Sequence, residues 1–238
     1  MSQSHGPQIV TDGLVFCVDA ASKRSYSGGS EWADLVGSND GTLTNGPTFD
    51  SDGAGCISFD GANDYVNLNS ETAHVQHSTF GNFTGADTNA YSVSLWMRST
   101  QIDGVGIFNC PTIVGRNNGD IYANLTLYDG YVYFAHYDSA WLGNIKSTTL
   151  VSDGVWHHVV YVNKTDETGD LYIDGVKEIS NESSSLSNAT RYFKINNIGL
   201  GYSSKYYNGD IALVQIYDKS LNKNEVLQNY NSAKGRFV

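Results

Sequence analysis

The feature that most limits the fold of this chain is a succession of short apolar runs, each ended within a few residues by Gly, Asn, Asp or Ser. Such runs are typical of β-strands joined by tight turns. The 25 Gly and 16 Tyr agree, since Gly suits turns and Tyr suits strands. The runs cover 14–19, 56–59, 65–68, 91–98, 121–128, 131–137, 155–162, 171–173, 193–200 and 211–217. About a dozen strands are expected, and the fold class is all-β.

Local patterns predict which face of a strand meets the core and which strands pair as hairpins. In 91–98, Tyr, Val, Leu and Met alternate with the other residues, so one face of this strand should meet a core. Asp129-Gly130 separates two runs, and Asp174-Gly175 separates 171–173 from 176–179, which predicts two antiparallel hairpins.

One segment near the C-terminus, 222–232, predicts a short surface helix. Asn222 can cap it, Glu225 can complete a capping box, and Leu221 can contact Val226. The polar stretches 69–89 and 181–190 are predicted loops. Because no linker or long repeat interrupts the strands, we expect an N-terminal arm, 1–12, and one domain, 13–238.

Charge and cysteine content exclude several classes of protein. The formal net charge is −11 and no cluster of Lys or Arg interrupts it, which argues against nucleic acid and anionic membranes as partners. Residues 1–8 lack the features of a secretory signal and no apolar run is long enough to span a membrane, so synthesis in a cytoplasm without membrane insertion is expected. The odd number of cysteines predicts free thiols, with Cys17 and Cys56 buried and Cys110 unpaired.

Five segments carry a family resemblance when they are read in order. They are 59–66 (FDGANDYV), 92–98 (SVSLWMR), 153–160 (DGVWHHVV), 171–175 (LYIDG) and 209–217 (GDIALVQIY). In this order they resemble the laminin G-like domain of the concanavalin A-like lectin/glucanase superfamily, over most of the chain from Gly13 to Tyr230. The resemblance implies a two-sheet antiparallel jelly-roll sandwich, concanavalin A-like, with one short C-terminal helix.

The opening of the chain resembles a variant of this domain that recurs in bacteriophage structural proteins. The segments concerned are 13–15, 19–20, 25–26, 32–35 and 45–49. This resemblance implies a virion protein, made in the host cytoplasm, whose partners are other capsid or tail/fibre proteins.

Calcium is the one cofactor that the family resemblance implies. Asp60, Asn63 and Asp64 supply oxygen atoms in a Gly-containing turn, and Asp210 could add another ligand. Two observations argue the other way: Ala212 stands where relatives often have Asp, and Asp-Gly turns form without metal.

Catalytic groups are not apparent. A retaining glucanase needs two carboxylates about 5 to 5.5 Å apart, and the acidic pair Glu167 and Asp170 is better explained as a solvated loop. His157 and His158 are adjacent, so they point to opposite faces of a strand, and His158 is expected to be a hydrogen-bonded core residue. We therefore predict a protein that is not an enzyme.

Aromatic residues are the candidates for sugar binding, because sugars bind on apolar platforms with a few directed hydrogen bonds. Tyr133 and Trp141 lie in a region crowded with aromatics, and Tyr202, Tyr206 and Tyr207 lie in a later loop, where Tyr206 and Tyr207 are expected to be exposed. Such residues also suit sheet packing or contacts between copies of the chain. The preferred hypothesis is a virion protein with a lectin-like domain for host-surface glycans; a purely structural decoration protein is the alternative, and a glycoside hydrolase a distant third.

Overall fold

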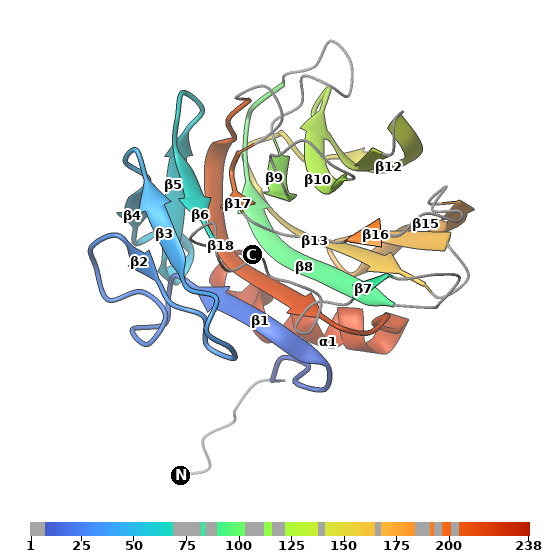
Figure 1. The fold of residues 1–238 in the computed structure, drawn as a ribbon, viewed down its shortest axis with the longest axis horizontal. Helices are drawn as coiled ribbons and strands as arrows, with labels where there is room; N and C mark the ends of the chain where they lie inside the picture. Colours follow the sequence, from blue (N-terminus) through green and yellow to red (C-terminus); the bar gives the residue numbers. More distant parts are fainter. Residues whose placement is uncertain are drawn as a thin grey trace.

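The chain folds into two antiparallel β-sheets that face each other across an apolar core (Figure 1). The computed structural model describes residues 8–68, 82–83, 90–102, 112–115, 122–137, 141–164, 168–183, 191–192, 197–200 and 205–238. Sheet A contains β1 (Leu14–Asp19), β4 (Thr48–Asp50), β5 (Cys56–Asp60), β8 (Tyr91–Arg98), β13 (Trp156–Asn163), β14 (Thr168–Ile173), β15 (Val176–Ser183) and β18 (Asn208–Tyr217). Sheet B contains β2 (Glu31–Trp32), β3 (Gly41–Thr44), β6 (Tyr65–Asn67), β9 (Thr112–Gly115), β10 (Tyr122–Tyr128), β11 (Tyr131–Tyr137), β12 (Trp141–Leu150) and β17 (Asn197–Ile198).

The strand order joins distant parts of the sequence. Sheet A runs β15-β14-β13-β8-β18-β5-β4, and β1 also pairs with β18, so the first and last strands lie side by side (Figure 1). Sheet B runs β12-β11-β10-β9-β17-β6-β3-β2, and a small third sheet pairs β7 (Asn82–Phe83) with β16 (Arg191–Tyr192). A short 3₁₀ helix, η1 (Asp52–Ala54), precedes β5. The predicted all-β, two-sheet antiparallel jelly-roll sandwich is confirmed.

Most of the predicted strands are present. Strands β1, β8 and β11 begin and end where the sequence predicts. The run 193–200 forms only β17, and residues 193–196 lie outside the described part of the chain. The sequence analysis missed β2, β3, β4, β7, β9, β12 and β16, and β7 lies within the predicted loop 69–89. Of these strands, β3 and β9 lie inside sheet B, and the others lie at sheet edges. An edge strand has one neighbour and little need for an apolar pattern, which explains why the edge strands were missed; β3 and β9 are only four residues long and carry little pattern.

Both predicted hairpins form with the expected turns. Asp129 and Gly130 have φ of 52° and 78°, and Asp174 and Gly175 have φ of 52° and 77°. Positive φ at both central residues defines the turn that matches the twist of paired strands, and Asp-Gly tolerates it. These turns set the register in which Tyr128 faces Tyr131.

The outer face of sheet A is buried as well, which the alternation in β8 did not indicate. Tyr91, Val93, Leu95 and Met97 point into the core as predicted. On the other face, Trp96 stacks on Tyr230 and Phe237, with ring centroids 5.6 and 4.4 Å apart respectively. The C-terminal segment therefore covers this sheet.

Helix α1 (Lys223–Ala233) forms this cover and has the predicted capping box. The Asn222 side chain accepts hydrogen bonds from the backbone N–H groups of Asn224 and Glu225, and the Glu225 carboxylate accepts one from Asn222 N. Leu221 and Val226 pack in the same apolar cluster. Within the described ranges, no helix has the length and apolar composition needed to cross a bilayer.

Part of the predicted N-terminal arm joins the domain. Val10 packs in the cluster beneath α1, and its N–H donates to Asn229 Oδ1 at 2.8 Å. Its carbonyl accepts a hydrogen bond from the Tyr217 hydroxyl at 3.1 Å. The structure thus extends the folded domain to Val10, inside the arm predicted for 1–12.

The residues that resemble phage proteins hold the N-terminal loops in place. Asp34 Oδ1 accepts the N–H of Cys17 at 3.0 Å and Oδ2 accepts that of Gly37 at 3.0 Å. Ser25 Oγ accepts from Asp19 N at 3.0 Å, and Trp32 is fully buried. These hydrogen bonds and the buried Trp32 ring stabilise the N-terminal loops.

Two of the three cysteines are described, and both are free and buried as predicted. Burial raises the pKa of the Cys17 thiol and of the Cys56 thiol to about 12. Neither is a reactive thiolate at neutral pH. Cys110 lies outside the described residues.

Candidate functional site

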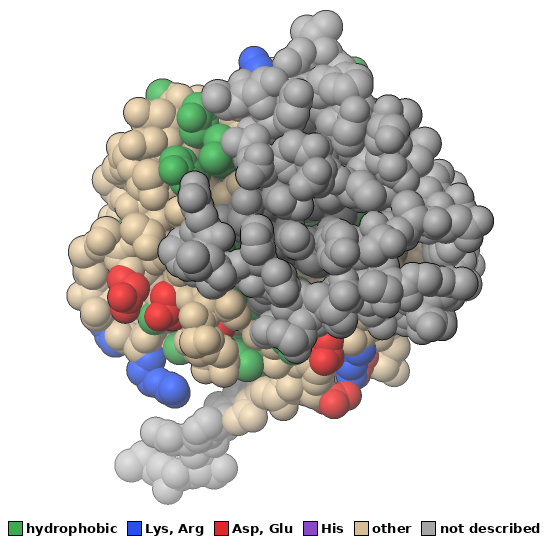
Figure 2. Space-filling view, viewed as in Figure 1, with side chains coloured by type: hydrophobic (Ala, Val, Ile, Leu, Met, Phe, Trp, Pro, Cys, Tyr) green, Lys and Arg blue, Asp and Glu red, His purple; other side chains and the backbone are tan. Residues whose placement is uncertain are grey.

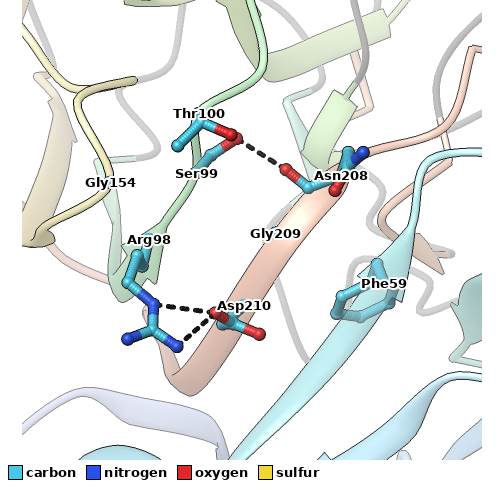
Figure 3. A pocket seen from close by; sticks show the side chains of 8 residues that line it. All are labelled: Phe59, Arg98, Ser99, Thr100, Gly154, Asn208, Gly209 and Asp210. Atoms are coloured by element: carbon cyan, nitrogen blue, oxygen red, sulfur yellow. Dashed lines mark hydrogen bonds and ion pairs between the residues drawn. The ribbon is translucent and has the colours of Figure 1, made fainter.

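A polar pocket lies where β8 ends and β18 begins, and we call it the rim pocket (Figure 3). Its volume is about 260 Å³. The lining residues come from three strands and two loops of sheet A, namely Phe59, Arg98, Ser99, Thr100, Gly154, Asn208, Gly209 and Asp210. The rim pocket therefore depends on the strand order β8-β18-β5.

The charged centre of the rim pocket is an ion pair between neighbouring strands. Asp210 lies opposite Arg98 on one side and Ser58 on the other. Its Oδ2 is 2.8 Å from both Nε and Nη2 of Arg98, and its Oδ1 accepts the Ser58 hydroxyl at 2.6 Å. Arg98 also pairs with Asp52 and lies over the Trp156 ring, 5.1 Å from its centroid. These contacts fix the guanidinium in the position seen in Figure 3.

The cluster formed by Arg98, Asp52 and Asp210 carries a net negative charge. One guanidinium faces two carboxylates, which leaves an excess of one negative charge. The hydrogen bond from Arg98 lowers the pKa of Asp52. Burial works against the charge of Arg98, but Asp210 and Asp52 outweigh it and raise the pKa of the guanidinium. The cluster is thus an ionised set of fixed donors and acceptors at neutral pH.

Close backbone contacts shape the opposite wall of the rim pocket. At Gly209, φ is 146° and an added Cβ would lie 2.3 Å from the carbonyl oxygen of Arg98, so the position requires Gly. The Ser99 hydroxyl donates to Asn208 O at 2.6 Å, and Gln101 Oε1 accepts the Asn208 N–H at 2.9 Å. The Asn208 residue is exposed, and its side-chain amide makes no hydrogen bond to another described residue. This amide is therefore available to a ligand.

The loop tyrosines differ from the prediction. Tyr207 was expected to be exposed but is fully buried: its ring packs edge-on against Phe59 and its hydroxyl donates to Arg98 O at 2.9 Å. It is a core residue that supports the rim pocket from below, so the prediction was wrong. Tyr206 is half-buried, and its carbonyl accepts from Gln101 Nε2 at 3.0 Å. Tyr202 lies outside the described residues.

The other predicted aromatics lie on sheet B. Tyr133 packs edge-to-face with Tyr128, with centroids 5.1 Å apart, and it faces Lys146 across the β11–β12 pair. The backbone of Trp141 pairs with Tyr137 at the start of β12, and the Trp141 side chain lies outside the described part of the structure. The backbone register therefore places the predicted aromatics Tyr133 and Trp141 on adjacent strands.

The predicted calcium ligands do not form one site. Asp60 Oδ1 accepts the N–H groups of Ala62 and Asn63 at 2.8 and 3.3 Å, and Asp64 Oδ2 accepts the N–H of Asp60 at 3.1 Å. Asp210 is bound to the Arg98 guanidinium, a poor setting for a cation ligand. No group of three or more His, Cys, Asp or Glu in the described ranges could hold a metal ion. As placed here, Asp210 does not join Asp60, Asn63 and Asp64 in one calcium site.

The two histidines occupy different settings, as their alternation predicts. His158 is buried, its Nε2 lies 2.9 Å from Ser94 Oγ, and burial lowers its pKa to about 3. This serine and histidine are both closed to solvent, so they cannot meet a substrate. His157 lies between Asp174 and Asp153, with Nδ1–Oδ2 and Nε2–Oδ1 distances of 2.8 and 3.2 Å. The prediction of His158 as a hydrogen-bonded core residue is confirmed.

Charged side chains are scattered over the described part of one face of the molecule. On the face shown in Figure 2, basic side chains lie in small separate groups near the margin, with acidic side chains between them. The described part of this face has no basic stripe of the kind that follows a phosphate backbone.

Known proteins of similar sequence or structure share this fold. Residues 60–227 match the family described as the concanavalin A-like lectin/glucanases superfamily. The binding domain of Paraclostridial Mosquitocidal Protein 1 is similar, with a TM-score of 0.66, 18% identity, and coverage of 92% of this chain and 52% of that one. Trypanosoma rangeli sialidase in complex with sialic acid has a TM-score of 0.67 and 15% identity, with 97% of this chain and 34% of the sialidase covered.

A third similar structure matches in size. Domain 4 of AbnA, a GH43 extracellular arabinanase from Geobacillus stearothermophilus in complex with arabinotriose, has a TM-score of 0.58 and 15% identity, and 91% of this chain and 98% of that domain are covered. By contrast, this chain spans about half of the mosquitocidal binding domain and about a third of the sialidase. At these identities the likeness concerns the fold. The match over 60–227 assigns the family: the chain belongs to the concanavalin A-like lectin/glucanases superfamily.

Proposed function

We propose that this chain is a lectin-like module that binds a neutral sugar residue in the rim pocket and does not cleave it. The observation that carries this proposal is the fixed set of planar polar groups in that pocket. Arg98 and Asp210 are held by each other, Asn208 offers a free amide, and the Phe59 ring is buried beneath the same pocket. Sugar sites combine apolar surface with a few such directed hydrogen bonds.

The size of the rim pocket supports a small ligand. Pockets for drug-sized ligands have volumes of about 300 to 1,000 Å³, and the rim pocket has about 260 Å³. One sugar ring, or the end of a longer glycan, suits this volume. The excess negative charge of Asp52 and Asp210 over Arg98 disfavours a sugar that carries a carboxylate.

The same charges support binding without turnover. Glycoside hydrolysis requires a general acid, whose pKa is raised so that it carries a proton at neutral pH. Asp52 has a lowered pKa because Arg98 hydrogen-bonds to it, and both oxygens of Asp210 are occupied by Arg98 and Ser58. Neither carboxylate is suited to donate a proton to a leaving group.

We also propose that the module is displayed on a bacteriophage particle, as part of the capsid or a tail fibre, where it attaches to host-surface glycans. The resemblance of 13–49 to phage structural proteins supports this placement. The alternative is a decoration protein that contacts virion neighbours and binds no sugar.

Substitution of Asn208 tests the proposal. Asn208→Ala removes the free amide and keeps the backbone bonds to Ser99 and Gln101, so thermal stability should be unchanged while affinity for the bound glycan falls about tenfold. The matched control is Asn224→Ala, an exposed Asn on α1. Binding to a glycan array and calorimetry measure both variants.

Three results would contradict the proposal. Full binding by Asn208→Ala would move the site elsewhere, and an array without any bound glycan would favour the decoration protein. Release of reducing sugar by the wild-type protein, abolished by one carboxylate substitution, would show an enzyme.

A further inference from the structure

A lysine lies on two tyrosine rings on the outer face of sheet B. Val132 and Phe134 point from β11 into the core, so Tyr131 and Tyr133 point away from it. The Nζ of Lys146, on β12, lies 4.0 Å from the centroid of Tyr131 and 5.5 Å from that of Tyr133. We call these three residues the lysine cradle.

The charge of the lysine cradle is not neutralised. Lys146 makes no ion pair with any residue in the part of the chain that the structure describes. This differs from Lys164 and Lys177, which both pair with Asp170 at 2.6 Å. Lys223 also makes no ion pair with a described residue, so the feature that distinguishes Lys146 is its position over two tyrosine rings.

The acidic side chain that reaches β12 is already engaged. Glu178, on β15, accepts hydrogen bonds from the backbone N–H groups of Thr148 and Thr149 at 2.7 and 3.2 Å, and from the Thr149 hydroxyl. Glu178 thus satisfies two backbone N–H groups of β12, and it does not pair with Lys146. The ammonium group has three N–H donors, and ring faces attract its charge without accepting conventional hydrogen bonds.

We propose that the lysine cradle binds an anionic group, a carboxylate or a phosphate ester, carried by a glycan. The rings hold the ammonium group in place on the sheet, so less side-chain entropy is lost when an anion binds. The anion approaches on the side away from Tyr131, and the cation then lies between ring and anion. Because Lys146 covers the face of Tyr131, stacking of a neutral sugar on that ring is disfavoured. The rim pocket has the opposite excess charge, so the two sites take different ligands.

Three probes distinguish the source of the anion. Calorimetric titrations use an oligogalacturonate, the neutral galactan oligosaccharide of equal length, and inorganic phosphate. Each is run at about 0.01 M and about 1 M salt, between which the Debye length falls from about 30 Å to about 3 Å. The full chain is used, as wild type and as Lys146→Met, Lys146→Arg and Lys223→Met. Lys223 is an exposed lysine on α1 and controls for the loss of one positive charge.

The oligogalacturonate or phosphate should bind at low salt and weaken at high salt. Lys146→Met should reduce this binding about tenfold or more, while Lys223→Met has little effect and Lys146→Arg, which keeps the charge and can lie on the rings, retains most of it. Tighter binding of the oligogalacturonate would identify a carboxylate as the ligand group, and tighter binding of phosphate would identify a phosphate ester. Equal losses in Lys146→Met and Lys223→Met, binding insensitive to salt, or absence of binding by either anion would overturn the proposal. Binding of Asn208→Ala to the same anions should be unchanged, which separates this site from the rim pocket.

Discussion

Single residues show why exposure is difficult to predict from sequence. Tyr206 and Tyr207 are neighbours in a polar loop, yet only Tyr207 is fully buried. Its N–H donates to Gly199 O at 2.8 Å and its ring meets Phe59, and both partners lie on other segments. Local composition contains no sign of these contacts. The ion pair of Arg98 with Asp210 was missed for the same reason, since only strand order brings the two together.

Replacing these tyrosines separately tests this assignment. Tyr207→Ala removes a buried ring and its hydrogen bonds, so the free energy of unfolding should fall by about 3 to 5 kcal/mol. Tyr206→Ala removes a half-buried ring, and the loss should be below about 1 kcal/mol. Urea denaturation measures both, and similar losses in the two variants would show that Tyr207 is not the core residue described.

Turns and helix ends were predicted best, because the sequence signal for each lies within a few adjacent residues. The hairpin turns at 129–130 and 174–175 and the capping box of α1 depend on adjacent residues, and all form as expected. The second buried face of β8 depends on a helix far along the chain, so its alternation predicted only one such face. Strand β12, with Ser, Thr and Gly, lies at an edge and was missed.

One contact between elements should depend on pH. His157 joins the turn before β13 to the β14–β15 hairpin through Asp153 and Asp174. Burial lowers its pKa, but the hydrogen bonds and charges of Asp174 and Asp153 outweigh this and raise it overall. The contribution of the charged ring to stability is therefore complete below the unfolded pKa of about 6.5 and is lost as pH rises through the higher folded pKa.

His157→Gln should remove this dependence. The difference in free energy of unfolding between wild type and variant should be largest near pH 6 and shrink at alkaline pH, as measured by urea denaturation across that range. A difference that grows with rising pH would show that the neutral ring is the stabilising form.

At the scale of the whole molecule, sequence predicted the class, the sandwich and the family, because five ordered segments extend across the chain. It did not predict the rim pocket, which draws Phe59, Arg98 and Asp210 from three strands that are neighbours only in sheet A. The predicted calcium ligands illustrate the same limit: Asp210 resembles a ligand by type, but its strand neighbour is an arginine.

A crystal structure of the full chain, soaked with the glycan that binds best on an array of neutral sugars, tests the central claim most directly. One sugar ring should occupy the rim pocket, within hydrogen-bond distance of the Asn208 amide and of the pair formed by Arg98 and Asp210. Its glycosidic bond should be intact after prolonged soaking. Density for the glycan only at another surface, with an empty rim pocket, would contradict the assignment of this pocket as the sugar site.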